Sequence, residues 1–334
     1  MKIAVDAMGG DFAPRNVIDG SILAASEYGY EIVLVGEECS IKKELSRHKK
    51  IPAGISIKHA SEIIGMDESP AVTIRRKKDS SINVAVNLVK EHMADAIFTA
   101  GNTGAMVCSA TLNLRTLEAV DRPGISVVLP TMLNSCLLID VGANVDCKPE
   151  HMFQYAVMGS VYCRYVLAKK QVKVGLLSIG EEKSKGNELI KTAHDLLSKS
   201  NLNFIGNIEG KDIFSGRADV IVCDGFTGNI ILKVLESVAE TVTGLFKQQL
   251  SSNILTMIGG LLSMPAFRKL KRKVDYAEHG GAPLLGIDGI CIVGHGRSSA
   301  KAIKNGIRVA AEAVLHDINQ HIIDSIKDNN SNNV

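Results

Sequence analysis

The chain opens with the stretch Lys2–Asp11, KIAVDAMGGD, and this stretch indicates the fold. Residues 3–5 are a short apolar run, which predicts a strand buried on both faces. An acid and a glycine pair follow at once (Asp6, Gly9-Gly10), and apolar residues at helical spacing begin at Val17. A buried strand, a glycine turn and a helix are the repeating unit of an α/β fold.

The same unit recurs along the chain. Apolar or β-branched runs, most of them ending in Gly, Asp or Asn, lie at residues 31–36, 55–57, 94–99, 125–130, 136–141, 172–179, 204–207, 220–224 and 290–293. Helical segments separate most of them, which predicts a mostly parallel sheet with helices on both faces. Right-handed crossovers then place the carboxyl ends of the strands at one edge, where ligands usually bind.

The composition narrows the class of protein. Of 334 residues, 46% are hydrophobic and 22% charged, which is typical of a globular chain with a large core and excludes fibrous or disordered classes. A net charge of +2 and an aromatic content of 4% argue against nucleic-acid binding. The seven cysteines lack C-x-x-C spacing, which indicates reduced thiols in a cytosolic protein, and no export signal is visible at the N-terminus.

Four polar turns follow predicted strands directly, at residues 6–11, 100–105, 140–146 and 224–229. Glycine lets the backbone approach a ligand closely, and the N–H groups that open the next helix suit an anion, especially phosphate. Any one of these turns taken alone is better explained by turn formation and helix capping. Because all four combine Gly with Asn or Asp at a strand end, together they favour a polar ligand site.

Standard nucleotide and hydrolase motifs are missing. The sequence has no G-x-x-x-x-G-K-[ST] and no G-x-S-x-G, and Met8-Gly9-Gly10-Asp11 stands where a G-x-G-x-x-G would follow the first strand. This argues against kinases, NTPases, NAD-dependent dehydrogenases and serine hydrolases. No convincing set of metal ligands is seen either, so we expect neither a cofactor nor a metal.

Three further residues are candidates, and two of them have two interpretations each. Lys185 either binds a phosphate oxygen or an oxyanion, or belongs to a solvated loop. His151 is either a structural residue at a helix start or a group for proton transfer near neutral pH. His295, between two glycines after the strand at 290–293, lies at another predicted strand end and is a better candidate than His279.

A separate segment combines apolar and basic residues. The uncharged stretch 248–267 contains an apolar part, 254–267, that is too short to span a membrane. Five basic residues follow within 268–273. This pattern predicts either contact with an anionic membrane surface or a core or dimer-interface helix. The residues expected to touch a membrane are Ile254, Leu255, Ile258, Leu261 and Leu262.

Taken together, the motifs identify a family. VDAMGGD at 5–11, TAGNTGA at 99–105, DVGAN at 140–144, KPEH at 148–151, KGNE at 185–188 and DGFTGN at 224–229 stand in this order without a large insertion. Over residues 1 to 320 the chain resembles the PlsX family of acyl-ACP:phosphate acyltransferases. One departure is Arg297, where the family pattern more often has a small residue; the added charge either strengthens anion binding or lies in solvent.

The resemblance implies a fold and a reaction. The fold is a three-layer α/β/α sandwich, like the isocitrate/isopropylmalate-dehydrogenase and phosphotransacetylase group, and it dimerises. The reaction moves a long-chain acyl group from acyl-ACP to inorganic phosphate. The acyl phosphate is then used by a glycerol-3-phosphate acyltransferase in bacterial phospholipid synthesis. The protein is expected in the cytoplasm, associated peripherally with the membrane.

The turns and the resemblance also give an expected site. Lys185 and Asn229 are expected to contact phosphate or the oxyanion, with His151 as the reserve acid–base group. Asn102, Thr103 and Asn144 complete the cradle. The remaining expected residues orient loops or bind the substrate: Asp6, Gly9, Gly10, Asp11, Gly104, Asn187, Glu188, Asp224, Thr227, Gly228 and His295.

Two other functions remain open at this point. A phosphotransacetylase acting on acyl-CoA would share the chemistry, and a non-catalytic scaffold would bind ACP or membrane without needing a phosphate cradle. For the domain layout we expect one catalytic domain over residues 1–326. A protruding apolar and basic helical segment is expected at 248–275, and a flexible tail at 327–334.

Overall fold

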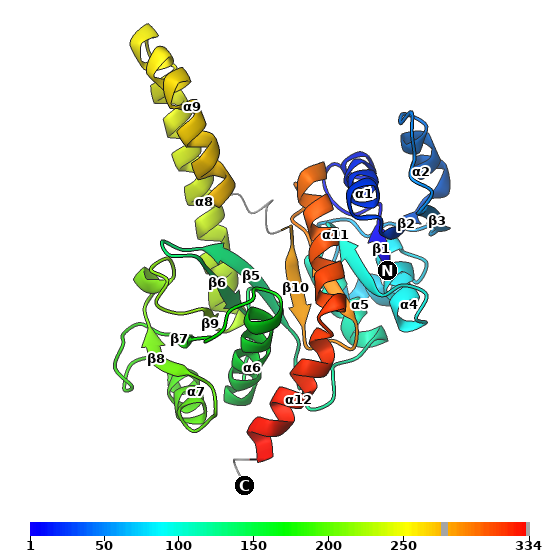
Figure 1. The fold of residues 1–334 in the computed structure, drawn as a ribbon. Coiled ribbons are helices and arrows are strands. Elements are labelled where there is room, and N and C mark those ends of the chain that lie inside the picture. The colour runs from blue at the N-terminus through cyan, green and yellow to red at the C-terminus, as the bar shows by residue number, and fades with distance from the viewer. Residues whose placement is uncertain (275–279, 332–334) are drawn as a thin grey trace.

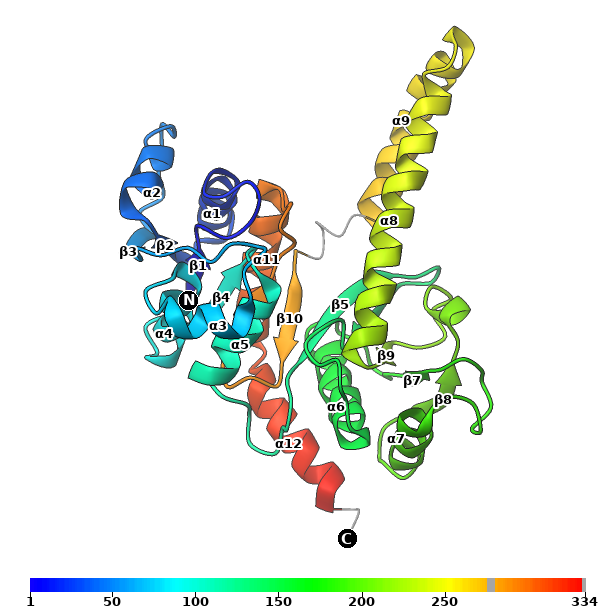
Figure 2. The same ribbon diagram turned by 180° about the vertical axis from the view of Figure 1, so that it is seen from behind.

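The computed structural model describes residues 1–274 and 280–331, without the side chains of Ile254, 266–274, 330 and 331. The strands described there form one eleven-stranded sheet in the order β3-β2-β1-β4-β11-β10-β5-β6-β9-β7-β8. Figures 1 and 2 show two halves with β10 (Ala282–Leu285) between them.

The first half alternates strands and helices. Strands β1, β2, β3, β4 and β11 are all parallel to one another. Helices α1 and α11 pack together on one face, and α4 and α5 cover the other. Its elements are β1 (Lys2–Asp6), α1 (Arg15–Tyr28), β2 (Glu31–Gly36), α2 (Glu38–Leu45), β3 (Ile55–His59), α3 (Pro70–Arg76), α4 (Ser81–Lys90), β4 (Ala96–Thr99), α5 (Thr103–Asn113), β11 (Ile290–Val293) and α11 (Ala300–Leu315).

The second half is built around β6, β9, β7 and β8, which are parallel to one another. Helix α6 is buried along most of its length and packs against β6, β9 and α7. Its elements are β5 (Gly124–Pro130), β6 (Ser135–Ile139), α6 (Pro149–Tyr165), β7 (Val174–Leu177), α7 (Glu188–Ser198), β8 (Phe204–Ile208), the short 3-10 helix η1 (Gly210–Asp212), β9 (Val220–Val222), α8 (Gly225–Leu250) and α9 (Ile254–Val274).

The buried strands form as their sequences predict. Residues 3–6 of β1, and all residues of β4, β7 and β9, are buried, which requires a helix layer on each face. One hydrophobic cluster lies under α1 and α11, a second under α4 and α5, and a third under α6 and α12 (Ile318–Ser331). The mostly parallel sheet and the helices on both faces confirm the fold class predicted from the sequence.

The prediction that all strands end at one edge is wrong. Strand β10 is antiparallel to both β11 and β5, and β5 is antiparallel to β6. These three antiparallel steps make β6, β9 and β7 run opposite to β1, β4 and β11. The two steps at β10 leave β5 parallel to β11, so the step from β5 to β6 is the one that reverses the second half.

The opposed strand ends nevertheless meet beside β10. Its first residue, Ala282, pairs with Val293 at the end of β11, and Leu284 pairs with Ile125 at the start of β5. Ile125 in turn lies next to the end of β6, because Ser126 pairs with Ile139. The ends of β11 and β6 therefore lie at nearly the same level of the sheet, with β10 and β5 between them.

Helices α8 and α9 lie side by side and project from the second half in both views (Figures 1 and 2). The projecting pair begins at Gly225, well before the expected start at residue 248, because α8 continues without a break from the fourth polar turn. None of the helices in the described ranges is long and apolar enough to cross a bilayer.

The C-terminal end differs from the flexible tail that we expected at 327–334. Helix α12 continues to Ser331, and residues 332–334 lie outside the described part. Ile322 and Ile326 are fully buried on the α12 face that packs on α6, and Lys327 pairs with Glu118 at 2.6 Å. These contacts hold the helix through most of the segment.

Candidate active site

A cleft of about 390 Å³ lies between the two halves, beside β10. Its polar wall comes from the start of α5, the loop after β6, helix α8 and the loop after β11, with the residues Thr103, Gly104, Gly142, Asn229, Lys233, Glu236 and His295. Its apolar wall comes mainly from β5 and its neighbours, with Ile125, Val127, Val128, Val141, Leu232, Ala282 and Val293. Residues of three of the four predicted turns, and the predicted His295, thus line one space.

The carboxylate of Asp6 organises the first half of the site. It is almost fully buried, accepts the Met8 N–H at 3.1 Å, and accepts the Thr99 hydroxyl at 2.7 Å. The Thr99 oxygen accepts the Gly101 N–H in turn, at 3.0 Å. Burial raises the pKa of Asp6. This chain of bonds joins the turn at 6–11 to the turn at 99–104.

The glycines of the first turn allow it to pack closely. A Cβ on Gly9 would lie 2.7 Å from the Gly101 nitrogen, and Gly10 has a φ of +105°, which favours glycine. The Asp11 N–H donates to the Gly296 carbonyl at 2.8 Å. The first turn therefore supports the loop that carries His295, and none of its residues lines the cleft.

Asn102 is committed to structure. Its side-chain oxygen caps α5 by accepting the Ala105 N–H at 3.0 Å. Its amide nitrogen lies 3.1–3.2 Å from the carbonyl oxygens of Gly65, Met66 and Glu68. The cap leaves Thr103 and Gly104 at the cleft wall, where the start of α5 favours an anion.

The carboxylate of Asp140 has the corresponding place in the second half. It is fully buried and accepts four backbone N–H groups at 2.8–3.1 Å, from Ile125, Gly142, Ala143 and Asn144. Burial raises the pKa of Asp140. The loop after β6 is thereby fixed against the start of β5.

Asn144, predicted as part of the cradle, holds this loop as well. Its amide nitrogen donates to the Pro123 carbonyl at 2.6 Å and to the Tyr155 hydroxyl at 2.8 Å. Its carbonyl accepts the Gly225 N–H at 2.9 Å. Asn144 therefore links the third turn to the fourth.

The fourth turn packs directly on the third. Asp224 caps α8 by accepting the N–H of Thr227 at 2.9 Å and its hydroxyl at 2.7 Å. A Cβ on Gly228 would lie only 1.9 Å from the Asp140 carbonyl oxygen, so only glycine fits. This close approach places Asn229 beside Gly142 at the cleft wall.

Two side-chain contacts connect α8 to the loop after β11, across the cleft. The His295 Nε2 lies 3.5 Å from a Glu236 carboxylate oxygen, and Arg297 pairs with Glu240 at 3.0 Å. The His295 Nδ1 accepts the Arg297 N–H at 3.1 Å. Arg297, which departs from the family pattern, therefore joins the two halves in this structure.

The other predicted residues lie away from the cleft. His151 is buried at the start of α6, where its Nδ1 accepts the Lys148 N–H, and burial lowers its pKa. Lys185 and Glu188 are exposed, and Asn187 caps α7. Their loop follows β7, which lies two strands from β6.

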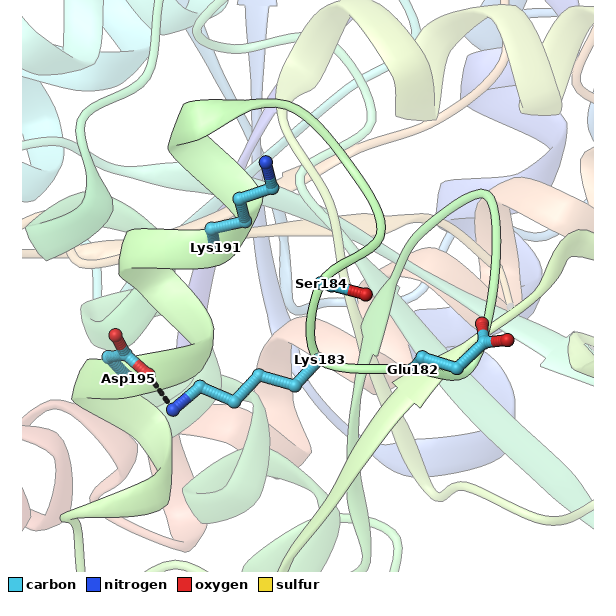
Figure 3. A pocket seen from close by; sticks show the side chains of 5 residues that line it. All are labelled: Glu182, Lys183, Ser184, Lys191 and Asp195. Carbon is cyan, nitrogen blue, oxygen red and sulfur yellow. Dashed lines mark ion pairs between the residues drawn. The ribbon is translucent and has the colours of Figure 1, made fainter.

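A second hollow lies next to the Lys185 loop (Figure 3). Its volume is about 580 Å³, and its five lining residues are all exposed: Glu182, Lys183, Ser184, Lys191 and Asp195. Lys183 pairs with Asp195 at 2.7 Å. We take the cleft as the candidate active site, because the polar turns converge there.

Comparison with known proteins agrees with the motifs. The model of the family described as "Fatty acid synthesis protein" matches residues 1–321. The chain belongs to this family. The resemblance to the PlsX family seen in the motifs is thereby confirmed.

Curated members of the family are similar over nearly the whole chain. The phosphate acyltransferase of Geotalea daltonii is 47% identical over 329 residues, covering 98% of this chain and 95% of that protein. The phosphate acyltransferase of Geobacter sulfurreducens is 46% identical over 327 residues, covering 98% and 94%.

Solved structures support the fold. A phosphotransacetylase from Streptococcus pyogenes superposes with a TM-score of 0.61 at 15% identity, covering 94% of each chain. A branched-chain phosphotransacylase from Enterococcus faecalis superposes with a TM-score of 0.59 at 13% identity, covering 95% of this chain and 99% of that one. At such identities the likeness shows the fold group only, which is the one predicted.

Two charged residues of the cleft were not predicted from the sequence. Lys233 and Glu236 line it but lie outside the quoted motifs. They are four and seven residues after Asn229, so all three share one face of α8. Continuing the helical spacing of three and four residues from Asn229, at the end of the fourth turn, identifies both positions in the sequence.

Gly228 offers a direct test of the contact between the third and fourth turns. Gly228→Ala should lower the free energy of unfolding by about 1–3 kcal/mol, because the methyl group would overlap the Asp140 carbonyl. Gly244→Ala, in the same helix with nothing within 4 Å of its Cβ, should be neutral or slightly stabilising. Urea unfolding of both variants measures the difference, and equal stabilities would contradict the described contact.

Proposed function

We propose that this protein transfers an acyl group from a thioester to inorganic phosphate and releases an acyl phosphate. The observation that carries the proposal is the cleft, where a polar wall of helix starts and short polar side chains faces an apolar wall. Such a space can hold phosphate beside an acyl chain. Membership of the family and the names of its curated relatives support the same reaction.

The reaction requires little from the protein beyond placement and charge stabilisation. A phosphate oxygen attacks the thioester carbonyl carbon, the carbon–sulfur bond breaks, and the phosphate proton ends on the released thiol. Holding the two reactants together supplies much of the acceleration. The oxyanion that forms during attack needs hydrogen-bond donors, and Asn229 stands on the polar wall to provide one.

The acyl chain has a matching surface. Ile125, Val127 and Val128 of β5, with Leu232 of α8, form a continuous part of the cleft wall. Burying an alkyl chain is favourable by about 0.8 kcal/mol per methylene. We therefore propose a long-chain substrate, with acyl-ACP as the donor. The acyl phosphate would be consumed by a glycerol-3-phosphate acyltransferase in phospholipid synthesis.

The roles of individual residues are part of the proposal. Lys185 would reach phosphate or the oxyanion from the loop after β7, and Glu188 or Asp224 would orient it. His151 would remain the reserve acid–base group. Thr103 and His295 would bind phosphate from the first half, which their places on the cleft wall support.

Purified protein should convert long-chain acyl-ACP and phosphate to acyl phosphate, identified directly by mass spectrometry. Long-chain acyl-CoA should be the poorer donor. If acyl-CoA were preferred, the protein would be a phosphotransacetylase. If the folded protein formed no acyl phosphate from either donor, a non-catalytic scaffold would replace the proposal. A Lys185→Ala variant, run in parallel, should lose activity, and full activity would remove Lys185 from the site.

We also propose that the tip of the α8–α9 pair contacts an anionic membrane surface. Leu255, Leu261 and Leu262 are 83%, 68% and 78% exposed, and Ile258 is exposed too. Five basic residues follow in the sequence at 268–273, whose side chains, like that of Ile254, lie outside the described part. Exposed apolar groups next to basic residues favour such binding.

The double variant Leu261→Ser, Leu262→Ser should bind vesicles containing phosphatidylglycerol at least about tenfold more weakly, since two leucines lose their burial in lipid. The matched control is Met132→Ser, Leu133→Ser, which removes residues that are 81% and 80% exposed on the β5–β6 turn. Vesicle sedimentation gives the bound fraction. Equal losses in both double variants would argue against a specific tip.

A homodimer is the last element of the proposal. Val234, Val238 and Val242 form an exposed stripe at helical spacing along α8, continued by Leu245. A contiguous exposed apolar stripe of this kind is typical of an interface. We propose a second copy of the chain as its partner.

Val238→Glu should convert the dimer to a monomer, because a charge would be buried in the interface. Analytical ultracentrifugation of the parent and the variant measures this. Leu315→Glu, at a 68% exposed position on α11, is the control and should leave the dimer intact. A parent that sediments as a monomer would refute the dimer.

A further inference from the structure

Helix α8 presents one face to the cleft. Asn229, Leu232, Lys233 and Glu236 all line it, and their spacing of three and four residues matches the helical period. The face starts in the second turn of the helix, where Asn229 stands. Lys233 lies one turn further along and is therefore directly above Asn229 on the same wall.

The charges on this face are unequally partnered. The Glu236 carboxylate is 3.5 Å from the His295 Nε2, and it is thus engaged with the opposite half. For Lys233 the described residues provide neither a hydrogen bond nor an ion pair, and its side chain is exposed. Its ammonium group is therefore available to a ligand in the cleft.

The surroundings of Lys233 favour an anion. The start of α5, with Thr103 and Gly104, lines the same cleft and presents the positive end of a helix dipole. A phosphate dianion between α5 and α8 would meet that helix start on one side and a full positive charge on the other. Lysine is a common point-charge ligand for phosphate.

We propose that Lys233 binds the inorganic phosphate substrate in the cleft, with Asn229 one turn below it. The proposal rests on the proposed acyl transfer to phosphate. In this role Lys233 contributes positive charge and hydrogen bonds to the nucleophile and takes no part in proton transfer. It differs from Lys185 in lining the cleft, whereas Lys185 lies on an exposed loop two strands away.

The test compares Lys233→Met, Lys233→Gln and Lys233→Arg with a control variant, Lys90→Met, which removes one charge from the exposed end of α4. Lys233→Met and Lys233→Gln should raise the KM for phosphate about tenfold to a hundredfold, as expected for a lost hydrogen bond to a charged group. The KM for the acyl donor should change little. Lys233→Arg should recover part of the loss, and Lys90→Met should match the parent.

A second readout does not need the acyl donor. Inorganic phosphate alone should raise the unfolding temperature of the parent and of Lys90→Met, because a ligand bound only to the folded state stabilises it. Lys233→Met and Lys233→Gln should lose this shift while unfolding at the parent's temperature without phosphate. This separates a binding defect from a folding defect.

The outcomes distinguish the two proposals. A normal phosphate KM and a normal phosphate shift in both Lys233→Met and Lys233→Gln would overturn the role of Lys233 and leave the reaction standing. The parent could also transfer no acyl group while phosphate raises its unfolding temperature and does not raise that of Lys233→Met or Lys233→Gln. This result would refute the reaction and retain the anion site. A rise confined to the KM of the acyl donor would also overturn the assignment to phosphate.

Discussion

The structure depends on how strands β10 and β5 join the two halves of the sheet. Strand β10 is antiparallel to its neighbour on each side, which leaves β5 parallel to β11, and the antiparallel pairing of β5 with β6 then reverses the second half relative to the first. Without this reversal the polar turns would be spread along one edge, up to several strand spacings apart. With it, residues of turns from both halves line one cleft beside β10. The candidate site is therefore a product of strand direction.

Each half then holds its turns with one buried carboxylate. Asp6 accepts a backbone N–H and the Thr99 hydroxyl, while Asp140 accepts four backbone N–H groups. Burying a carboxylate is costly unless its oxygens are fully hydrogen-bonded, and here the bonds come from the loops that must be fixed. The residues that reach the cleft, such as Asn229 and Lys233, stand on this rigid frame.

Much of this was predictable from the sequence. Buried strands and polar turns are local patterns, and they correctly gave the fold class and three of the turns that line the cleft. The reversal was missed, although β5 and β6 were both predicted and the connection between Pro130 and Ser135 is too short for a parallel crossover. Strand β10 was missed because it is short and its glycine-rich surroundings look like a loop. Asn102 and Asn144 have the residue type of a ligand cradle, yet their amides are used within the loops. Whether a polar side chain faces inward or outward is a tertiary property that one sequence does not encode locally.

Helix α8 lines the cleft at one end and extends far beyond it at the other. It is one uninterrupted helix of 26 residues, about 39 Å long, held at its first turn by the contact of Gly228 with Asp140. Measured from that pivot, Lys233 is about 8 Å away and Leu250 about 33 Å away, at 1.5 Å per residue. A tilt that shifts the outer end by about 4 Å would move Lys233 by about 1 Å, by the same geometry. A partner that binds the far end of this helix and displaces it thus also moves Lys233 at the cleft, by about a quarter of that displacement.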